Sequence, residues 1–222
     1  MGLTEPTIPV RGLYWNRFDS KDLARKNELW KILCEGFFQS RVVGPVVLDV
    51  GAGACEFINH IRAERKIAVD LNPETRQFAS QGVEVFQAAA DRMPFLADGS
   101  VDTVFMSNLL EHLEDKSRVM AVLGEARRVL RPGGRLLILH PNLRLVGVSY
   151  WDFFDHQVPL TDRSLSEVVA VEGFKVRRLI PAFLPYTTKG RLPQWGILVR
   201  AYLRLPFLWR IFGRQTFLVA EK

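Results

Sequence analysis

Short apolar runs alternate along the chain with segments whose apolar residues repeat at helical spacing. The runs predict seven strands, at residues 46–50, 66–70, 83–88, 100–106, 135–140, 174–180 and 215–221. Helices are expected at about 20–39, 57–62, from 73, at 115–130 and at 161–172. Asp115 and Thr161 are candidate N-caps of the last two. Strands that alternate with helices predict an α/β domain around a mostly parallel sheet.

The first strand runs directly into a glycine turn at Gly51-Ala-Gly53. Glycines let the backbone turn tightly and approach a ligand, and the following helix offers its N-terminal amides, which predicts a nucleotide-like cofactor. A dinucleotide fingerprint needs a third glycine where this chain has Glu56, so a dehydrogenase is disfavoured. Asp49, two residues before the first glycine, would repel a pyrophosphate but attract a cationic amino-acid group.

The stretch Asp49-Val-Gly51-Ala-Gly53 resembles motif I of the class I S-adenosylmethionine-dependent methyltransferases, and Asp70-Leu-Asn-Pro73 resembles the second motif. An acid such as Asp70 at the tip of the second strand can accept both ribose hydroxyls, although it could instead cap the next helix. Cys55 departs from the pattern, since many members carry glycine there. The resemblance, to the type 11 branch, covers about residues 46–140. It implies a Rossmann-like seven-stranded sheet flanked by helices, with the last strand antiparallel.

The resemblance also implies further cofactor contacts after the third and fourth strands. Asp91 is the candidate partner of the adenine amine, or else a solvent-facing loop acid. Ser107 and Asn108 are expected to face the methionine part, and His112 lies beside the cofactor or is a packed structural histidine. The predicted cofactor residues are Asp49, Gly51, Ala52, Gly53, Asp70, Leu71, Ala90, Asp91, Arg92, Ser107, Asn108 and His112.

Residues 140–142 and 150–156 occupy the segment that normally lines the acceptor pocket in such enzymes, although their aromatic residues could simply complete the core. The sulfonium methyl is already electrophilic, so transfer needs in-line placement and no metal. A hydroxyl acceptor adds a general base, for which His156, His140 and Asp155 are candidates.

The predicted function is therefore methyl transfer to a small molecule, with a hydroxyl of a sugar or secondary metabolite favoured by a resemblance to bacterial glycan and secondary-metabolite enzymes. A lipid-linked or membrane-associated acceptor is the alternative. A nucleic-acid acceptor is disfavoured, because base-amine methylation usually shows an Asn/Asp-Pro-Pro-aromatic motif where this chain has Ser107-Asn-Leu-Leu110. Binding of the cofactor without turnover is a further alternative.

Composition bears on the number of domains, on the cellular compartment and on one unusual segment. The 222 residues, 48% of them hydrophobic, suit a single domain, and two cysteines with no signal peptide favour the cytoplasm. The formal charge of +6 is concentrated near the end, because no acid occurs between Glu172 and Glu221. Residues 181–214 mix arginines with apolar residues and are too charged for a membrane span.

Two segments are predicted to flank the domain. We expect residues 181–214 to form a lid or a homodimer face, with peripheral membrane contact through residues 192–214 as the alternative. An N-terminal helical cap at 14–40 would cover the cofactor cleft, where Tyr14 and Arg17 could touch ligand, or would simply pack on the core.

Overall fold

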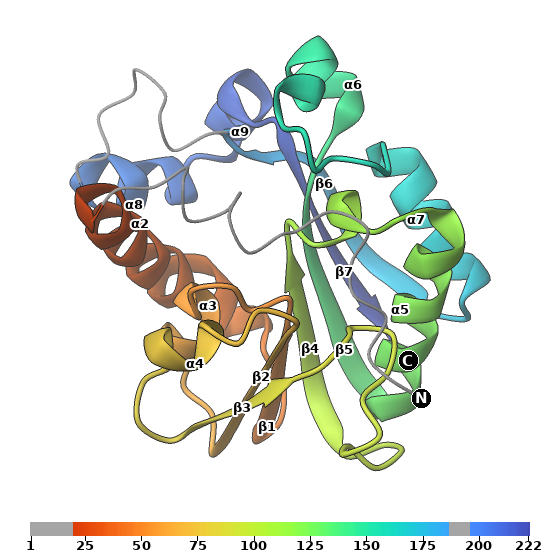
Figure 1. The fold of residues 1–222 in the computed structure, drawn as a ribbon. Helices are drawn as coiled ribbons and strands as arrows, with labels where there is room; N and C mark the ends of the chain where they lie inside the picture. The colour runs from red at the N-terminus through yellow and green to blue at the C-terminus, as the bar shows by residue number, and fades with distance from the viewer. Residues whose placement is uncertain (1–19, 187–195) are drawn as a thin grey trace.

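A sheet of seven strands organises the computed structural model, which describes residues 20–186 and 196–222 (Figure 1). The strands are β1 (Val46–Val50), β2 (Arg65–Asp70), β3 (Val83–Gln87), β4 (Val101–Ser107), β5 (Leu130–Pro141), β6 (Lys175–Leu184) and β7 (Gln215–Glu221). Their order is β3-β2-β1-β4-β5-β7-β6, and β7 runs antiparallel to both of its neighbours while the pairs among β1 to β5 are parallel. The predicted Rossmann-like sheet is confirmed.

The five predicted helical segments are present, and further short helices occur that were not predicted, among them two within residues 196–212. They are α2 (Ser20–Leu33), a π-helical turn η2 (Cys34–Phe38), η3 (Gln39–Arg41), α3 (Glu56–His60), α4 (Thr75–Phe78), η4 (Leu110–His112), α5 (Lys116–Val129), α6 (Leu143–Val146), η5 (Gly147–Asp152), α7 (Asp162–Val171), α8 (Gly196–Arg204) and α9 (Pro206–Phe212). Both predicted caps are confirmed. Asp115 accepts from the Arg118 amide, and Thr161 forms a capping box with Ser164.

Two hydrophobic cores lie on opposite faces of the sheet, because successive strand residues point to opposite sides. Leu48 and Val50 face α5 and α7, whereas Val47 faces α2, α3, α8 and α9. The second core is rich in aromatic rings. Phe37, from the π-helical turn, stacks on Phe183 of β6 with ring centroids 4.1 Å apart. Because helices cover both faces of the sheet, the connecting loops lie at the ends of the strands (Figure 1).

The predicted insert at 181–214 begins later than expected, since Pro181 to Leu184 continue β6. A proline cannot donate to the strand ladder, and the register of β6 against β7 shifts between Ile180 and Leu184. The carbonyl of Pro181 accepts from Thr216 Oγ1 at 3.0 Å instead.

The two helices of the insert pack on the second core, α8 against α2 and α9 against β6 (Figure 1). Tyr202 donates its hydroxyl to the carbonyl of Phe183, and Trp209 Nε1 donates to Tyr202 O at 2.8 Å. Several apolar side chains of α8 and α9 remain exposed, namely Ile197, Leu198, Phe207, Ile211 and Phe212. Across residues 20–186 and 196–222, we find no helix with the length and apolarity that a membrane crossing requires. Tyr14, Arg17 and residues 187–195 lie outside the described part of the chain.

Candidate cofactor and acceptor site

The glycine turn at the end of β1 has the backbone conformation that the sequence predicts. Gly51 and Gly53 have φ angles of +71° and +51°, in the region that favours glycine. The amides of Gly51 and Ala52 both donate to the carbonyl of Val69 in β2, at 2.8 and 3.2 Å. A Cβ at Gly51 would lie 2.8 Å from Leu109 Cδ1, so the close approach there involves a side chain that the sequence analysis did not single out.

Cys55 adopts the same left-handed region with a φ of 59°, although it is not glycine. This conformation costs an ordinary residue on the order of 1 kcal/mol. The side chain of Cys55 is fully buried. Cysteine is therefore accommodated here in a backbone conformation that favours glycine.

Asp70 joins the glycine turn to the end of β2. Its Oδ2 accepts from the Gly53 amide and its Oδ1 from the Asn72 amide, each at 2.8 Å. Burial raises the pKa of Asp70, and the backbone amides oppose that shift. The helix-capping alternative is wrong, because the N-cap of α4 is Glu74. Each carboxylate oxygen has two lone pairs, so ribose hydroxyls can still donate to Asp70, and that contact stays a prediction.

Asp49 is 3% exposed, in the β1 strand next to α3. Burial raises the pKa of Asp49 well above its usual range, and the nearby Glu56 raises it further, while a hydrogen bond from the Ile58 amide lowers it. Glu56 itself lies 2.8 Å from Lys26 Nζ. Asp49 is thus an enclosed acid behind the turn, and its contact with a cationic cofactor group stays a prediction.

The predicted adenine residues lie in the loop after β3. Asp91 forms an ion pair with Arg118 of α5, a partner that the sequence analysis missed. Leu71 and Arg92 are exposed, and Ala90 is half-buried against the first core. The ion pair with Arg118 argues against the alternative that Asp91 is a loop acid facing solvent alone. The contact of Asp91 with the adenine amine stays a prediction.

Ser107 and Asn108 mark the carboxyl end of β4. Ser107 pairs with Leu139 of β5, and the Asn108 amide donates to the Leu139 carbonyl at 2.9 Å. Asn108 has a φ of 50°, a conformation that asparagine tolerates better than most residues. The chain therefore turns sharply after β4 and carries the next residues toward the end of β5.

A cluster of carboxylates and imidazoles, which we call the Glu-His cluster, gathers beyond the ends of β4 and β5. It consists of Glu111, His112, His140, Asp155 and His156. Glu111 Oε2 lies 3.1 Å from His140 Nδ1, and His112 Nδ1 lies 3.3 Å from Asp155 Oδ2. The rings of His112 and His156 meet edge to face with centroids 4.9 Å apart. Three predicted catalytic residues and one predicted cofactor residue thus come together around Glu111, which the sequence analysis did not single out.

Burial and charge act in opposite directions within the Glu-His cluster. Burial lowers the pKa of His112, but Asp155 and Glu111 raise it more, so the net shift is upward. Burial likewise raises the pKa of Glu111, yet His140 and His112 bring the net shift downward. Burial lowers the pKa of His156. His140 is 1% exposed and the side chain of His112 is 29% exposed, so His112 is the imidazole of this pair that is open to a ligand.

Backbone hydrogen bonds fix the 155–158 segment beside Glu111. The amides of Gln157 and Val158 donate to the Glu111 carbonyl at 2.7 and 3.2 Å. Tyr150 donates its hydroxyl to Val158 O at 2.5 Å, and its ring lies 4.6 Å from that of His156. The positions of Asp155 and His156 therefore depend on main-chain bonds between segments more than 40 residues apart.

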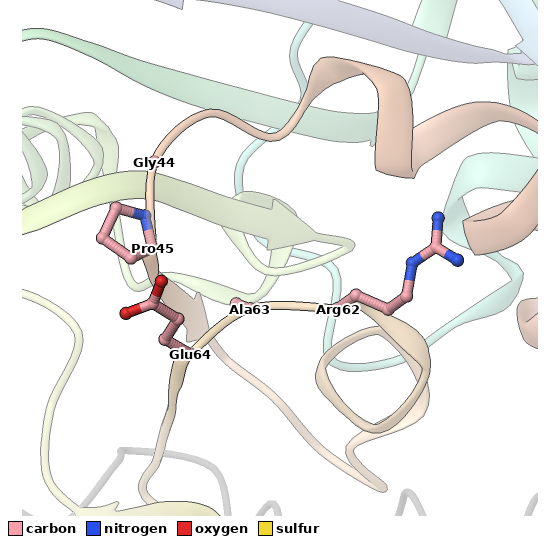
Figure 2. A pocket seen from close by; sticks show the side chains of 5 residues that line it. All are labelled: Gly44, Pro45, Arg62, Ala63 and Glu64. Carbon is pink, nitrogen blue, oxygen red and sulfur yellow. The ribbon is translucent and has the colours of Figure 1, made fainter.

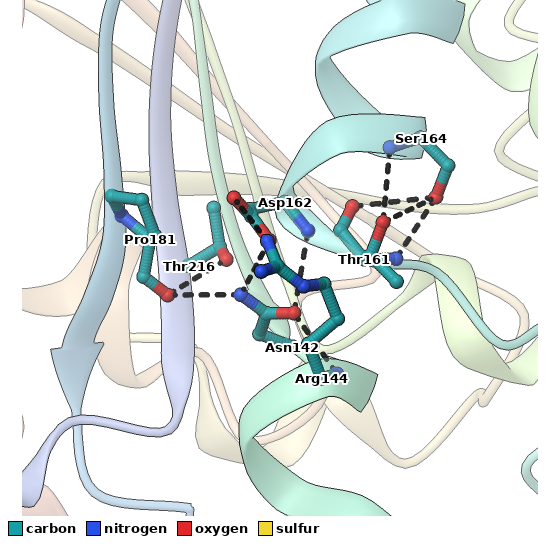
Figure 3. A network of polar contacts seen from close by, with 7 residues as sticks. All are labelled: Asn142, Arg144, Thr161, Asp162, Ser164, Pro181 and Thr216. Carbon is teal, nitrogen blue, oxygen red and sulfur yellow. Dashed lines mark hydrogen bonds and ion pairs between the residues drawn. The ribbon is translucent and has the colours of Figure 1, made fainter.

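A second polar network anchors the chain just after β5 (Figure 3). Asn142 Nδ2 donates to Asp162 Oδ1 at 3.0 Å and to Pro181 O at 3.2 Å. Arg144 Nη1 donates to Asp162 Oδ1 at 3.1 Å. Asn142 is buried, so within the predicted acceptor segment 140–142 it joins β5, α7 and β6.

A pocket at the other end of the sheet is lined by Gly44, Pro45, Arg62, Ala63 and Glu64 (Figure 2). These residues directly precede β1 and β2. In open α/β sheets ligands bind at the carboxyl ends of the strands. The pocket in Figure 2 is therefore remote from the glycine turn and from the Glu-His cluster.

The sheet and the glycine turn define a Rossmann-like fold, and comparison with known proteins makes this more specific. Residues 48–138 match a family described as a methyltransferase domain. An uncharacterized methyltransferase from Mycobacterium sp. (strain JLS) is 33% identical over 164 residues, which cover 71% of this chain and 58% of that protein. A ubiquinone/menaquinone biosynthesis C-methyltransferase from Klebsiella pneumoniae is 28% identical over 194 residues, covering 77% and 72%.

A solved structure has the same fold. The crystal structure of a SAM-dependent methyltransferase from Archaeoglobus fulgidus matches 92% of this chain and 100% of that chain, with a TM-score of 0.65 at 20% identity. The chain spans about half the length of the first curated relatives, 44% and 58%. Residues 48–138 therefore match the methyltransferase domain family, and the chain as a whole has the fold of an S-adenosylmethionine-dependent methyltransferase.

Proposed function

We propose that the protein transfers a methyl group from S-adenosylmethionine to a hydroxyl of a small molecule, such as a sugar or a secondary metabolite. The observation that carries this proposal is the Glu-His cluster at the ends of β4 and β5, because β4 pairs directly with β1, the strand that leads into the glycine turn. Ligands of open α/β sheets bind at this edge. A cluster of imidazoles and carboxylates there suits an acceptor that must lose a proton.

The cofactor, when bound, supplies a methyl group on a sulfonium. The residues fit it, because Gly51 and Gly53 open the turn and Asp70 stands at the tip of β2. Transfer forms a bond between the acceptor oxygen and the methyl carbon, breaks the methyl–sulfur bond, and leaves S-adenosylhomocysteine and one proton. His112, oriented by Asp155, is the exposed imidazole that can meet the acceptor, and the cluster takes up the proton.

Methyl transfer to carbon is the second candidate. It is favoured by the similarity to a ubiquinone/menaquinone biosynthesis C-methyltransferase over 77% of the chain. A carbon acceptor also loses a proton after methylation, so the same cluster serves both reactions. The two differ in the product, since hydriodic acid cleaves the methyl ether formed at a hydroxyl and leaves a carbon-bound methyl group in place.

Calorimetry and a product screen test the proposal. S-adenosylhomocysteine should bind with micromolar strength and NAD should not. A panel of hydroxylated metabolites with isotope-labelled S-adenosylmethionine should then give a labelled product, whose position mass spectrometry and NMR assign. His156 is one of the predicted general bases, so His156→Ala should lower turnover by about 10²-fold with unchanged affinity for S-adenosylhomocysteine. Preferred binding of NAD would overturn the proposal, and full turnover in His156→Ala would remove His156 from the reaction.

A further inference from the structure

Three side chains of the Glu-His cluster are close enough to share one ion. Glu111, His112 and His156 each offer one ligand atom, and the three atoms lie within 4.8 Å of one another. In a tetrahedral site with metal bonds of about 2.0 Å, ligand atoms lie about 3.3 Å apart. Small rotations of these side chains, two of which are buried, would therefore bring the ligand atoms onto a common centre.

The groups around these three residues have the arrangement that a metal site needs. His112 Nδ1 lies 3.2 Å from the Asp155 carbonyl and 3.3 Å from Asp155 Oδ2, so a proton on Nδ1 leaves Nε2 to bind an ion. Metal-binding histidines usually donate their other N–H to a carboxylate or carbonyl in this way. Glu111 in turn lies against the buried ring of His140.

His156 supplies an independent observation. The residue is 8% exposed, and within residues 20–186 and 196–222 its buried Nδ1 has no hydrogen-bond partner. Leaving a buried polar atom unsatisfied is unfavourable, and such atoms in folded proteins usually have a protein, water or ion partner. The ring is held by stacking on Phe153, with centroids 5.0 Å apart, so it is kept in place without a hydrogen bond at that nitrogen.

We propose that Glu111, His112 and His156 bind a divalent transition-metal ion whose open coordination position takes an oxygen of the acceptor. Two imidazoles and one carboxylate favour Zn²⁺, Mn²⁺, Fe²⁺ or Co²⁺ over Mg²⁺, and three protein ligands are typical of catalytic rather than structural zinc sites. A bound ion lowers the pKa of a hydroxyl that coordinates it.

The role of the ion in methyl transfer rests on the proposed function, whereas the binding of the ion does not. The sequence analysis expects no metal, and the proposal departs from it because only the fold brings His156 next to Glu111. The alternative is that protons, rather than an ion, balance the carboxylates of the cluster.

Titration of the intact protein with Zn²⁺ tests the site. Protein stripped with a chelator should bind one equivalent of Zn²⁺ by calorimetry, and mass spectrometry of the metal content should agree. Glu111→Gln and His156→Gln should each weaken binding by roughly 100-fold or more. Asp155→Asn, which alters the carboxylate that contacts His112, should weaken Zn²⁺ binding by about 10 to 100-fold. His60→Ala is the matched control, because His60 is a part-exposed histidine that contacts Asn27 and should leave binding unchanged.

Affinity for S-adenosylhomocysteine reports whether each variant is folded. Wild-type protein that binds S-adenosylhomocysteine but no stoichiometric Zn²⁺ or Mn²⁺ would overturn the metal site and leave the proposed function standing. Zn²⁺ binding that survives in folded His156→Gln would also overturn it. If Glu111→Gln fails to fold, the comparison of His156→Gln with His60→Ala decides alone. Metal binding without any methylated product would count against the proposed function and not against the site.

Discussion

Asp70 is the residue whose removal tests the cofactor site most directly, because its two carboxylate oxygens already hold two backbone amides. Asp70→Ala removes the acceptors of the Gly53 and Asn72 amides. Hydrogen bonds to charged groups contribute about 1.5 to 3 kcal/mol each, which sets an upper limit of about 3 to 6 kcal/mol for the pair.

The loss should be smaller than that limit, because burial raises the pKa of Asp70 and its charge is therefore unfavourably placed. We expect the free energy of unfolding to fall by about 1 to 3 kcal/mol. For a chain of this size, 1 kcal/mol corresponds to about 2 to 4 °C in Tm, so Tm should fall by roughly 2 to 12 °C. Asp70→Asn keeps the shape and one acceptor oxygen, and its Tm should lie between those of the wild type and Asp70→Ala.

Calorimetry then separates the structural role of Asp70 in the glycine turn from its predicted contact with the ribose. Loss of the hydrogen bonds from the ribose hydroxyls should weaken the binding of S-adenosylhomocysteine by about 1 to 3 kcal/mol, or roughly 5 to 150-fold. An unchanged Tm in Asp70→Ala would refute the structural role of the carboxylate. A lower Tm with wild-type affinity for S-adenosylhomocysteine would refute the ribose contact alone.

Three further predictions concern other parts of the molecule. Because the pKa of buried Asp49 is raised on folding, the folded state binds the proton of Asp49 more tightly than the unfolded state does, and stability falls as pH rises from about 4 toward the folded pKa. Asp49→Asn should remove this pH dependence and should melt at a higher temperature than the wild type at pH 8. Equal melting temperatures at pH 8 would contradict the prediction. Asp91→Ala should weaken the binding of S-adenosylhomocysteine by about 1 to 2 kcal/mol. Arg118→Ala breaks the same ion pair and should weaken this binding less. Equal losses in the two variants would show that the effect comes from breaking the ion pair and not from a contact between Asp91 and the cofactor. The exposed Phe207 and Ile211 should be covered by a second subunit. Light scattering should therefore give a mass of about twice 25.4 kDa, and Phe207→Asp should give a monomer. Binding to anionic vesicles that is abolished by high salt would favour membrane contact instead.

Features that depend on neighbouring residues could be predicted from the sequence. The last strand was expected at 215–221 and runs from Gln215 to Glu221. Asp115 and Thr161 cap their helices because a cap bonds to an amide only three positions away. The glycine turn and the acid at the tip of β2 were recognised by their spacing, and the hydrogen bond between Gly53 and Asp70 joins them directly.

Features that join distant segments could not be predicted in this way. The pairs Asp91–Arg118 and Glu111–His140 depend on how loops from different strands meet at one edge of the sheet. Leu109 packs over Gly51 only because the chain turns back after β4. The helix that begins after Asp115 is expected to reach residue 130, yet Leu130 already pairs with β4, and the register resumes only at Arg135 after a shift.

The aromatic contacts of Phe37 link two segments at opposite ends of the chain. Its ring stacks on Phe183 at 4.1 Å and meets Trp209 at 5.7 Å and Phe217 at 5.2 Å. The N-terminal helix and the helices of the insert therefore share one packed surface, so neither can be exchanged alone without leaving a cavity or a clash. A chimera that borrows the insert of a relative should fold only when the matching N-terminal helix is borrowed with it, and acceptor preference in such chains should be inherited from the two segments as a pair.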